Sequence, residues 1–134
     1  MNTDIAAQKA LDRLARVGFE QLTESEKILA TVWTFAAEVA NRGFVKYFTR
    51  PAGNTALYAP EALRKIGAPE LAGIAAKANA VFGAGGPPPD RKVRLELVRA
   101  LDGGATKTLE TLETRYFESP EDVDELLEAY LNRK

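Results

Sequence analysis

The sequence contains neither cysteine nor histidine. Without cysteine there are no disulfides and no thiolate chemistry, which fits a reducing compartment. Without histidine the chain lacks the usual general base at neutral pH and the commonest transition-metal ligand. Hydrolase triads, zinc sites and two-histidine iron sites are therefore excluded or need unusual substitutes. We expect no metal, no cofactor and no enzymatic activity.

The sequence also lacks a long apolar run and a basic N-terminal leader. The longest weakly polar stretch, residues 28–40, contains Thr31, Thr34 and Glu38 and is too short to span a bilayer. Residues 1–8 show no signal-peptide pattern. A chain of 134 residues fits one domain with a real core. We expect a soluble, cytoplasmic protein with a single domain, residues 1–134.

Charge is nearly balanced overall, with a formal net charge of −1, but it is unevenly distributed. Residues 42–109 carry eleven basic and five acidic side chains, a net of +6. Residues 110–134 carry eight acidic and three basic side chains, a net of −5. If these segments do not interleave on folding, the molecule has two faces of opposite charge.

Apolar residues recur at helical spacing throughout, and no strand-like alternation is present. The pattern predicts an all-α domain of about six or seven helices. The expected helices cover residues 3–17, 23–43, 54–66 or 60–66, 69–82, 90–101, 109–116 and 119–131, with a short helical turn at 44–48 and a Gly/Pro loop at 83–89.

Several residues predict where these helices begin and end. Thr23 and Glu26 match a capping box, and Gly43 suits the end of the helix that follows. Asn54 is a natural N-cap, but Pro60 lies within the span that it would begin, so the helix either kinks at Pro60 or starts there. Ser119 is expected to cap the last helix.

The helix after Asp90 contains the densest basic run in the sequence. We expect Val93, Leu97, Val98 and Leu101 to face inward, and Arg91, Arg94 and Arg99 to face outward. The run has no interleaved aromatic residues, so a solvated helix face is favoured over a nucleic-acid patch.

Aromatic residues form two features on the long helix and its continuation. Phe44, Tyr47 and Phe48 fall on one side of a helical turn, which favours core packing over a partner anchor. Trp33 lies within the apolar arc of the long helix and is also expected in the core. Glu38 and Asn41 are expected to tie down the turn at Gly43, whereas a functional Glu38 would have to face a cleft.

The segment from Glu38 to Phe48, with Gly53 and the run Ile66-Gly67-Ala68, resembles a bacterial helical domain. Its members usually read Glu-Val-x-Asn-Gly-Gly-Phe-x-Gln-Tyr-Phe-x-Asn, then Gly and Ala-Leu-x-x-Ile-Gly-Ala. The resemblance covers about residues 22–131. The shared motif residues singled out here are Glu38, Asn41, Gly43, Phe44, Tyr47, Phe48, Gly53 and Gly67.

The resemblance implies a function as well as a fold. One characterised member of that family is a DNA-mimic protein, an acidic helical dimer that occupies the DNA-binding surface of a transcriptional regulator. In this chain Arg42, Lys46 and Arg50 replace glycine, glutamine and asparagine of the usual motif, which adds three positive charges. DNA mimicry requires a continuous negative surface, which only the C-terminal region can supply.

We therefore expect a non-enzymatic interaction module that binds a protein, such as a transcriptional regulator, through an acidic surface, with a homodimer left open. Two alternatives remain. One is a weak nucleic-acid binder that uses residues 42–50 and 91–99, and the other is an enzyme centred on Glu38 with Tyr47. The expected partner-binding residues are Glu113, Glu118, Glu121, Asp122, Asp124, Glu125 and Glu128.

Overall fold

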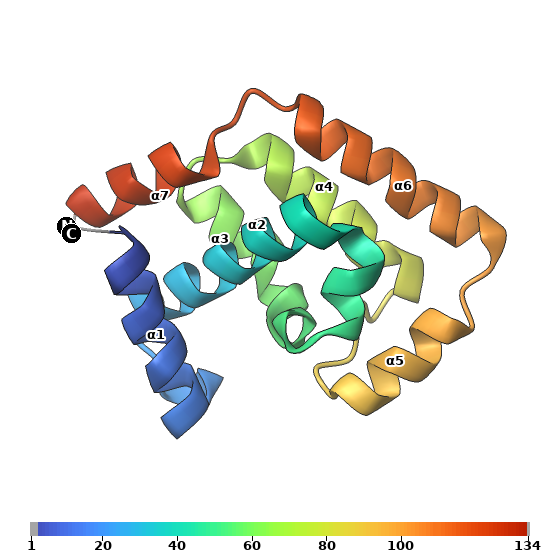
Figure 1. Cartoon of the computed structure of the whole chain (residues 1–134), viewed down its shortest axis with the longest axis horizontal. Helices are drawn as coiled ribbons and strands as arrows, with labels where there is room; N and C mark the ends of the chain where they lie inside the picture. The colour runs from blue at the N-terminus through green and yellow to red at the C-terminus, as the bar shows by residue number, and fades with distance from the viewer. Residues whose placement is uncertain (1–2, 134) are drawn as a thin grey trace.

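The computed structural model describes residues 3–133 as a single all-α domain, as expected from the sequence. Within that range there are seven α-helices and three short 3₁₀ helices (Figure 1). The α-helices are α1 (Thr3–Val17), α2 (Glu24–Thr49), α3 (Ala59–Lys65), α4 (Pro69–Asn79), α5 (Arg91–Arg99), α6 (Gly103–Glu118) and α7 (Val123–Asn132). The 3₁₀ helices are η1 (Phe19–Gln21), η2 (Pro51–Tyr58) and η3 (Ala80–Phe82).

Helix α2 runs through the middle of the molecule and contacts α1, α3, α5, α6, α7 and η2 (Figure 1). It begins with the predicted capping box. The Thr23 hydroxyl accepts a 3.2 Å hydrogen bond from the Glu26 amide, and the Glu26 carboxylate accepts a 2.8 Å bond from the Thr23 amide. Ile28, Val32 and Phe35 on its inward face are fully buried, so α2 supplies the centre of the core.

Gly43 breaks α2 into two segments, which confirms that the first helical run ends there. Its φ of 86° and ψ of 175° lie in a region that is essentially restricted to glycine. The second segment carries Phe44, Tyr47 and Phe48, all of which are at most 1% exposed. The three rings therefore belong to the core, where Tyr47 packs edge-on against Phe35 with ring centroids 5.3 Å apart.

The segment after Pro51 differs from the longer helix that Asn54 was expected to cap. Residues 51–58 form η2, and α3 begins at Ala59 with Pro60 in its first turn. Proline is favoured in the first turn of a helix because amide groups there have no carbonyl acceptor within the helix. The N–H group that proline lacks therefore costs no hydrogen bond. Of the two alternatives, Pro60 therefore starts the helix, and the Asn54 side chain is used elsewhere.

Helix α5 presents a different face to the core from the one predicted. Arg94 is fully buried, whereas Val93 and Leu97 are 46% and 40% exposed. The inward stripe consists of Arg94, Leu95, Val98 and Leu101. The prediction was wrong for Val93, Arg94 and Leu97, because a buried arginine at a stripe position looks, in sequence, like the polar side of the helix. The inward positions of Val98 and Leu101 and the exposure of Arg91 and Arg99 are as predicted.

Other helix boundaries are shifted by a few residues. Helix α4 ends at Asn79, and Phe82 lies in η3. Asp102 caps α6, which starts at Gly103. Asp122, rather than Ser119, caps α7, and the Ser119 hydroxyl accepts a bond from the Glu121 amide. Of the helices in residues 3–133, none is both long and apolar enough to cross a membrane.

Candidate interaction surfaces

The guanidinium of Arg94 is buried beneath the second segment of α2 and donates five hydrogen bonds, one from each of its N–H groups. Burial lowers the Arg94 pKa from its usual value. No carboxylate accepts from it in the described chain. The acceptors are the carbonyl oxygens of Phe48, Arg50, Pro88 and Pro89 and the side-chain oxygen of Asn54, at 2.5–3.1 Å.

Gly53, one of the motif residues, is required by the position of Arg94. A Cβ atom at Gly53 would lie 2.7 Å from the Tyr47 carbonyl oxygen and 2.9 Å from the Arg94 Nε. Both distances are shorter than those at which a Cβ atom normally approaches another heavy atom. Arg94 thus joins α5 to the end of α2 and to η2, and only glycine leaves room for it.

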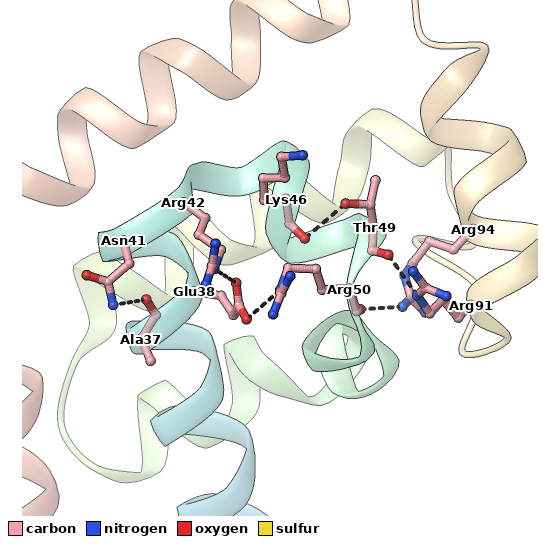
Figure 2. A network of polar contacts seen from close by, with 9 residues as sticks. All are labelled: Ala37, Glu38, Asn41, Arg42, Lys46, Thr49, Arg50, Arg91 and Arg94. Atoms are coloured by element: carbon pink, nitrogen blue, oxygen red, sulfur yellow. Dashed lines mark hydrogen bonds and ion pairs between the residues drawn. The ribbon is translucent and has the colours of Figure 1, made fainter.

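Glu38 does not face a cleft but lies between two arginines (Figure 2). Its carboxylate is 2.9 Å from the Arg50 Nε and 3.4 Å from the Arg42 Nε. The Asn41 amide donates to the carbonyl oxygen of Ala37. Glu38 therefore links the two segments of α2 across the break, whereas Asn41 bonds within its own helix and not to the turn.

The two basic segments noted in the sequence meet in space (Figure 2). The Arg91 Nε donates a 2.8 Å bond to the carbonyl oxygen of Thr49, which places α5 beside residues 42–50. Arg94 is buried below this junction, and Arg42 and Arg50 are both paired with Glu38. We call the basic residues of segments 42–50 and 91–99 the basic cluster. It has fewer unpaired, exposed charges than the sequence indicates.

Two of the acidic residues expected to bind a partner serve as helix caps. The Glu113 carboxylate accepts a 2.7 Å bond from the Phe44 amide, directly after the break in α2. The Glu121 carboxylate accepts bonds of 3.0 Å and 2.7 Å from the amides of Glu70 and Leu71 in the first turn of α4. Both carboxylates lie at the positive end of a helix dipole and are engaged by the protein itself.

The other acidic residues remain exposed. They follow the chain from the end of α6 through the connecting loop and along α7 (Figure 1). Asp122 also caps α7 by accepting from the Glu125 amide. None of these residues forms an ion pair within residues 3–133. We call the set Glu118, Asp122, Asp124, Glu125 and Glu128 the acidic face.

Two residues that sequence reasoning did not include belong with the acidic face, Glu70 and Phe117. Glu70 lies beside the connecting loop because its amide donates to Glu121, and its side chain is exposed. Phe117, next to Glu118 in the chain, is 63% exposed. Nothing in the local sequence places Glu70 there, since it is 51 residues from Glu121. In the sequence, Phe117 lies outside the apolar stripe of Leu109, Leu112 and Tyr116, and this position could have predicted that its ring is exposed.

A hollow of about 380 Å³ opens between α2 and the loop that leads into α7. Trp33 is half-buried at its wall rather than enclosed in the core as expected. Burial, and then the nearby Asp124 charge, raise the Tyr116 pKa from its usual value. The hollow is lined by Trp33, Ala36, Ala37, Ala40, Leu71, Tyr116, Glu121, Asp122, Val123 and Asp124.

Gly67 ends α3 and has a φ of 91°, a conformation that other residues rarely adopt. The motif glycines are therefore explained by the backbone: Gly43 and Gly67 have positive φ angles, and Gly53 leaves no room for a Cβ atom. Phe44, Tyr47 and Phe48 account for the motif aromatics as core residues. The motif thus defines how the centre of the domain is built, and the acidic face lies outside it.

These features define a class of small all-helical domain with a broken central helix. The chain belongs to the DMP19-like protein family, whose family model matches residues 20–134. A search of curated proteins and a search of solved structures each found no match.

Proposed function

We propose that this protein is a non-enzymatic interaction module of the bacterial cytoplasm. Its acidic face would bind a basic surface on another protein, in the manner of a DNA mimic, and the partner would be a DNA-binding regulator. The observation that carries the proposal is that the carboxylates of the acidic face are exposed and have no ion pairs in residues 3–133. Membership of the DMP19-like family supports it.

The arrangement of charge on α7 favours binding over stability. Asp124 and Glu128 are four residues apart, so they are neighbours on the helix surface and repel one another. The first-turn position of Asp124 and Glu125 offsets part of this cost through the helix dipole, but Glu128 lies beyond the first turn. The positive charges of a basic partner would relieve the repulsion between these carboxylates. Its lysines and arginines would also displace the counterions that the carboxylates hold.

Phe117 supports a protein partner rather than a purely solubilising role for the charge. An aromatic ring that is 63% exposed is costly to leave in water, and aromatic residues are enriched at the centres of protein interfaces. Here the exposed ring belongs to the residue directly before Glu118 in the chain. The combination of one apolar anchor with flanking charge suits a specific contact.

Capture of partners from a nuclease-treated lysate, followed by mass spectrometry, tests the proposal. The test variant reverses Glu118, Asp124, Glu125 and Glu128 to lysine and leaves the capping residues intact. A matched control makes the same change in charge elsewhere, at the exposed residues Asp12, Glu20, Glu96 and Glu110. We expect the wild type and the control to capture a DNA-binding protein that added DNA displaces, and the test variant to lose it. Equal capture by the test variant would refute the proposal.

A second candidate function is weak nucleic-acid binding through the basic cluster. The observation that favours it is the contact that brings Arg91 beside residues 42–50. Lys46 and Lys92 are exposed and make no ion pair in residues 3–133, so reversing them to glutamate removes charge without breaking a described contact. Binding of a DNA duplex that falls steeply with salt and disappears in this variant would support the second candidate.

A further inference from the structure

We propose that the hollow beside the acidic face receives an arginine side chain of the basic partner. This inference rests on the function proposed above and adds a specific site to it. The hollow combines one wall of aromatic and small apolar side chains, from Trp33 and the alanines of α2, with carboxylates of the loop before α7 and its first turn. Few ligand groups other than a cation on an apolar stem fit such a lining.

The shape of the hollow follows from small residues on α2. Trp33, Ala36, Ala37 and Ala40 are spaced at i, i+3, i+4 and i+7, so they form one stripe of the helix. Three of the four are alanine, and their short side chains leave space that larger residues would fill. Ala37 and Ala40 are exposed, so the stripe is open to a side chain arriving from solvent.

The charge at the rim favours a cation. Glu121 is engaged by two backbone amides of α4 and Asp122 by the Glu125 amide, but both Asp122 and Asp124 are exposed and form no ion pair in the described chain. Tyr116, which also lines the hollow, is half-buried. A cation between the aspartates and the aromatic rings would gain from both the carboxylate charge and the ring faces.

Arginine suits this site better than lysine. Its planar guanidinium stacks on an aromatic ring and can bond a carboxylate through two parallel N–H groups. It is also less strongly hydrated than an ammonium group and loses less on entering a partly closed hollow. The alanines of α2 would contact its methylene stem. The site thus selects for the residue type that DNA-binding proteins commonly present to phosphates.

The chain contains a single tryptophan, Trp33, so intrinsic tryptophan fluorescence reports on this hollow alone. The probes are octa-arginine and octa-lysine peptides at low salt, with total binding measured independently by calorimetry. We expect octa-arginine to change the Trp33 emission saturably and to bind more tightly than octa-lysine. The Ala37→Leu variant, which fills the hollow, should bind octa-arginine roughly tenfold more weakly, an effect between those of an exposed and a fully desolvated cation–π contact.

Two further variants separate the hollow from the acidic face and from folding. Ala76→Leu makes the same substitution at an exposed position on α4 outside the hollow and should bind like the wild type. Asp124→Asn removes a rim charge without adding volume and should also weaken octa-arginine binding. Thermal unfolding of each variant checks that the fold is retained.

The possible failures can be told apart. If octa-arginine binds by calorimetry but leaves the Trp33 emission unchanged, or if Ala37→Leu binds as well as the wild type, the arginine site is refuted. Loss of binding in the charge-reversed acidic-face variant would, in that case, still support the proposed function. If neither peptide binds to the wild type, the proposed function fails and the arginine site fails with it.

Discussion

The Glu113 carboxylate accepts a 2.7 Å hydrogen bond from the backbone amide of Phe44, a residue 69 positions earlier in the chain. Phe44 directly follows the break at Gly43, so its amide is one of the donors that the second segment of α2 cannot satisfy within the helix. Glu113 is therefore an N-cap supplied by a distant helix. Its negative charge also lies at the positive end of that segment's dipole.

Replacing Glu113 with alanine should destabilise the fold by about 1–2 kcal/mol, as expected for the loss of an N-cap. The measurement is urea unfolding followed by circular dichroism. Glu110→Ala, on the same helix, is the control because the Glu110 side chain is exposed and makes no described hydrogen bond or ion pair. It should change stability by less than about 0.5 kcal/mol. Equal effects of the two substitutions would show that the cap contributes nothing.

Gly43→Ala should be destabilising for two separable reasons. The residue has a positive φ of 86°, and its Cβ atom would lie 2.5 Å from a Glu113 carboxylate oxygen. We expect a total cost of about 2–4 kcal/mol, of which backbone strain supplies roughly 1–3 kcal/mol. In a Glu113→Ala background the steric part should vanish, so the two substitutions should not be additive. Strict additivity in the double-mutant cycle would contradict this explanation.

Arg94→Lys and Arg94→Met should both be strongly destabilising, because each buried acceptor left without a donor costs about 1–3 kcal/mol. Lysine keeps the charge but cannot reproduce the planar fork that bonds four carbonyl groups and Asn54. Methionine removes the charge and leaves the same acceptors without donors. Arg99→Lys, at an exposed position on the same helix, is the control. A mild effect of Arg94→Lys would mean that the guanidinium geometry is not required.

Tyr47 should make the fold sensitive to alkaline pH. Burial raises its pKa above the usual value, because the charged phenolate is disfavoured in the core. A raised folded-state pKa means that the stability contribution is full below the unfolded-state pKa of about 10 and is lost as pH rises above it. Tyr47→Phe should remove this part of the dependence, as measured by denaturant unfolding across alkaline pH.

The neutral-pH effect of Tyr47→Phe gives an independent check. The Tyr47 hydroxyl has no hydrogen-bond partner in the described chain, so its removal should leave stability at neutral pH unchanged or slightly higher. A loss of more than about 1 kcal/mol at neutral pH would indicate a hydrogen bond to that hydroxyl. Tyr116→Phe provides a comparison, since Tyr116 is only half-buried and should have a smaller effect at alkaline pH.

The features that sequence reasoning predicted are those encoded by neighbouring residues. The capping box of Thr23 and Glu26 spans four positions, and the break at Gly43 depends on one residue. The burial of Phe44, Tyr47 and Phe48 follows from their spacing within one helical turn. In each case the relevant partner lies within the local pattern, so the helical periodicity was sufficient.

The features that could not be predicted depend on contacts between distant residues. Glu113 and Glu121 looked like free surface charges because the amides that they bind are 69 and 50 or 51 residues away. Arg94 was assigned to the outer face because its carbonyl acceptors come from turns whose orientation the sequence does not fix. One signal was available, since Arg94 shares a helical stripe with Val98 and Leu101.

The long-range caps also bear on how the chain folds while it is being synthesised. The amides at the start of the second α2 segment and of α4 have no carboxylate cap until α6 and the loop before α7 have left the ribosome. Arg94 must likewise leave the ribosome before its guanidinium can pack against the turn around Gly53. A nascent chain that ends before residue 121 therefore has helices with unfinished N-termini. We expect productive folding to begin late in translation and to be nearly all-or-none, with shorter nascent chains relying on chaperones.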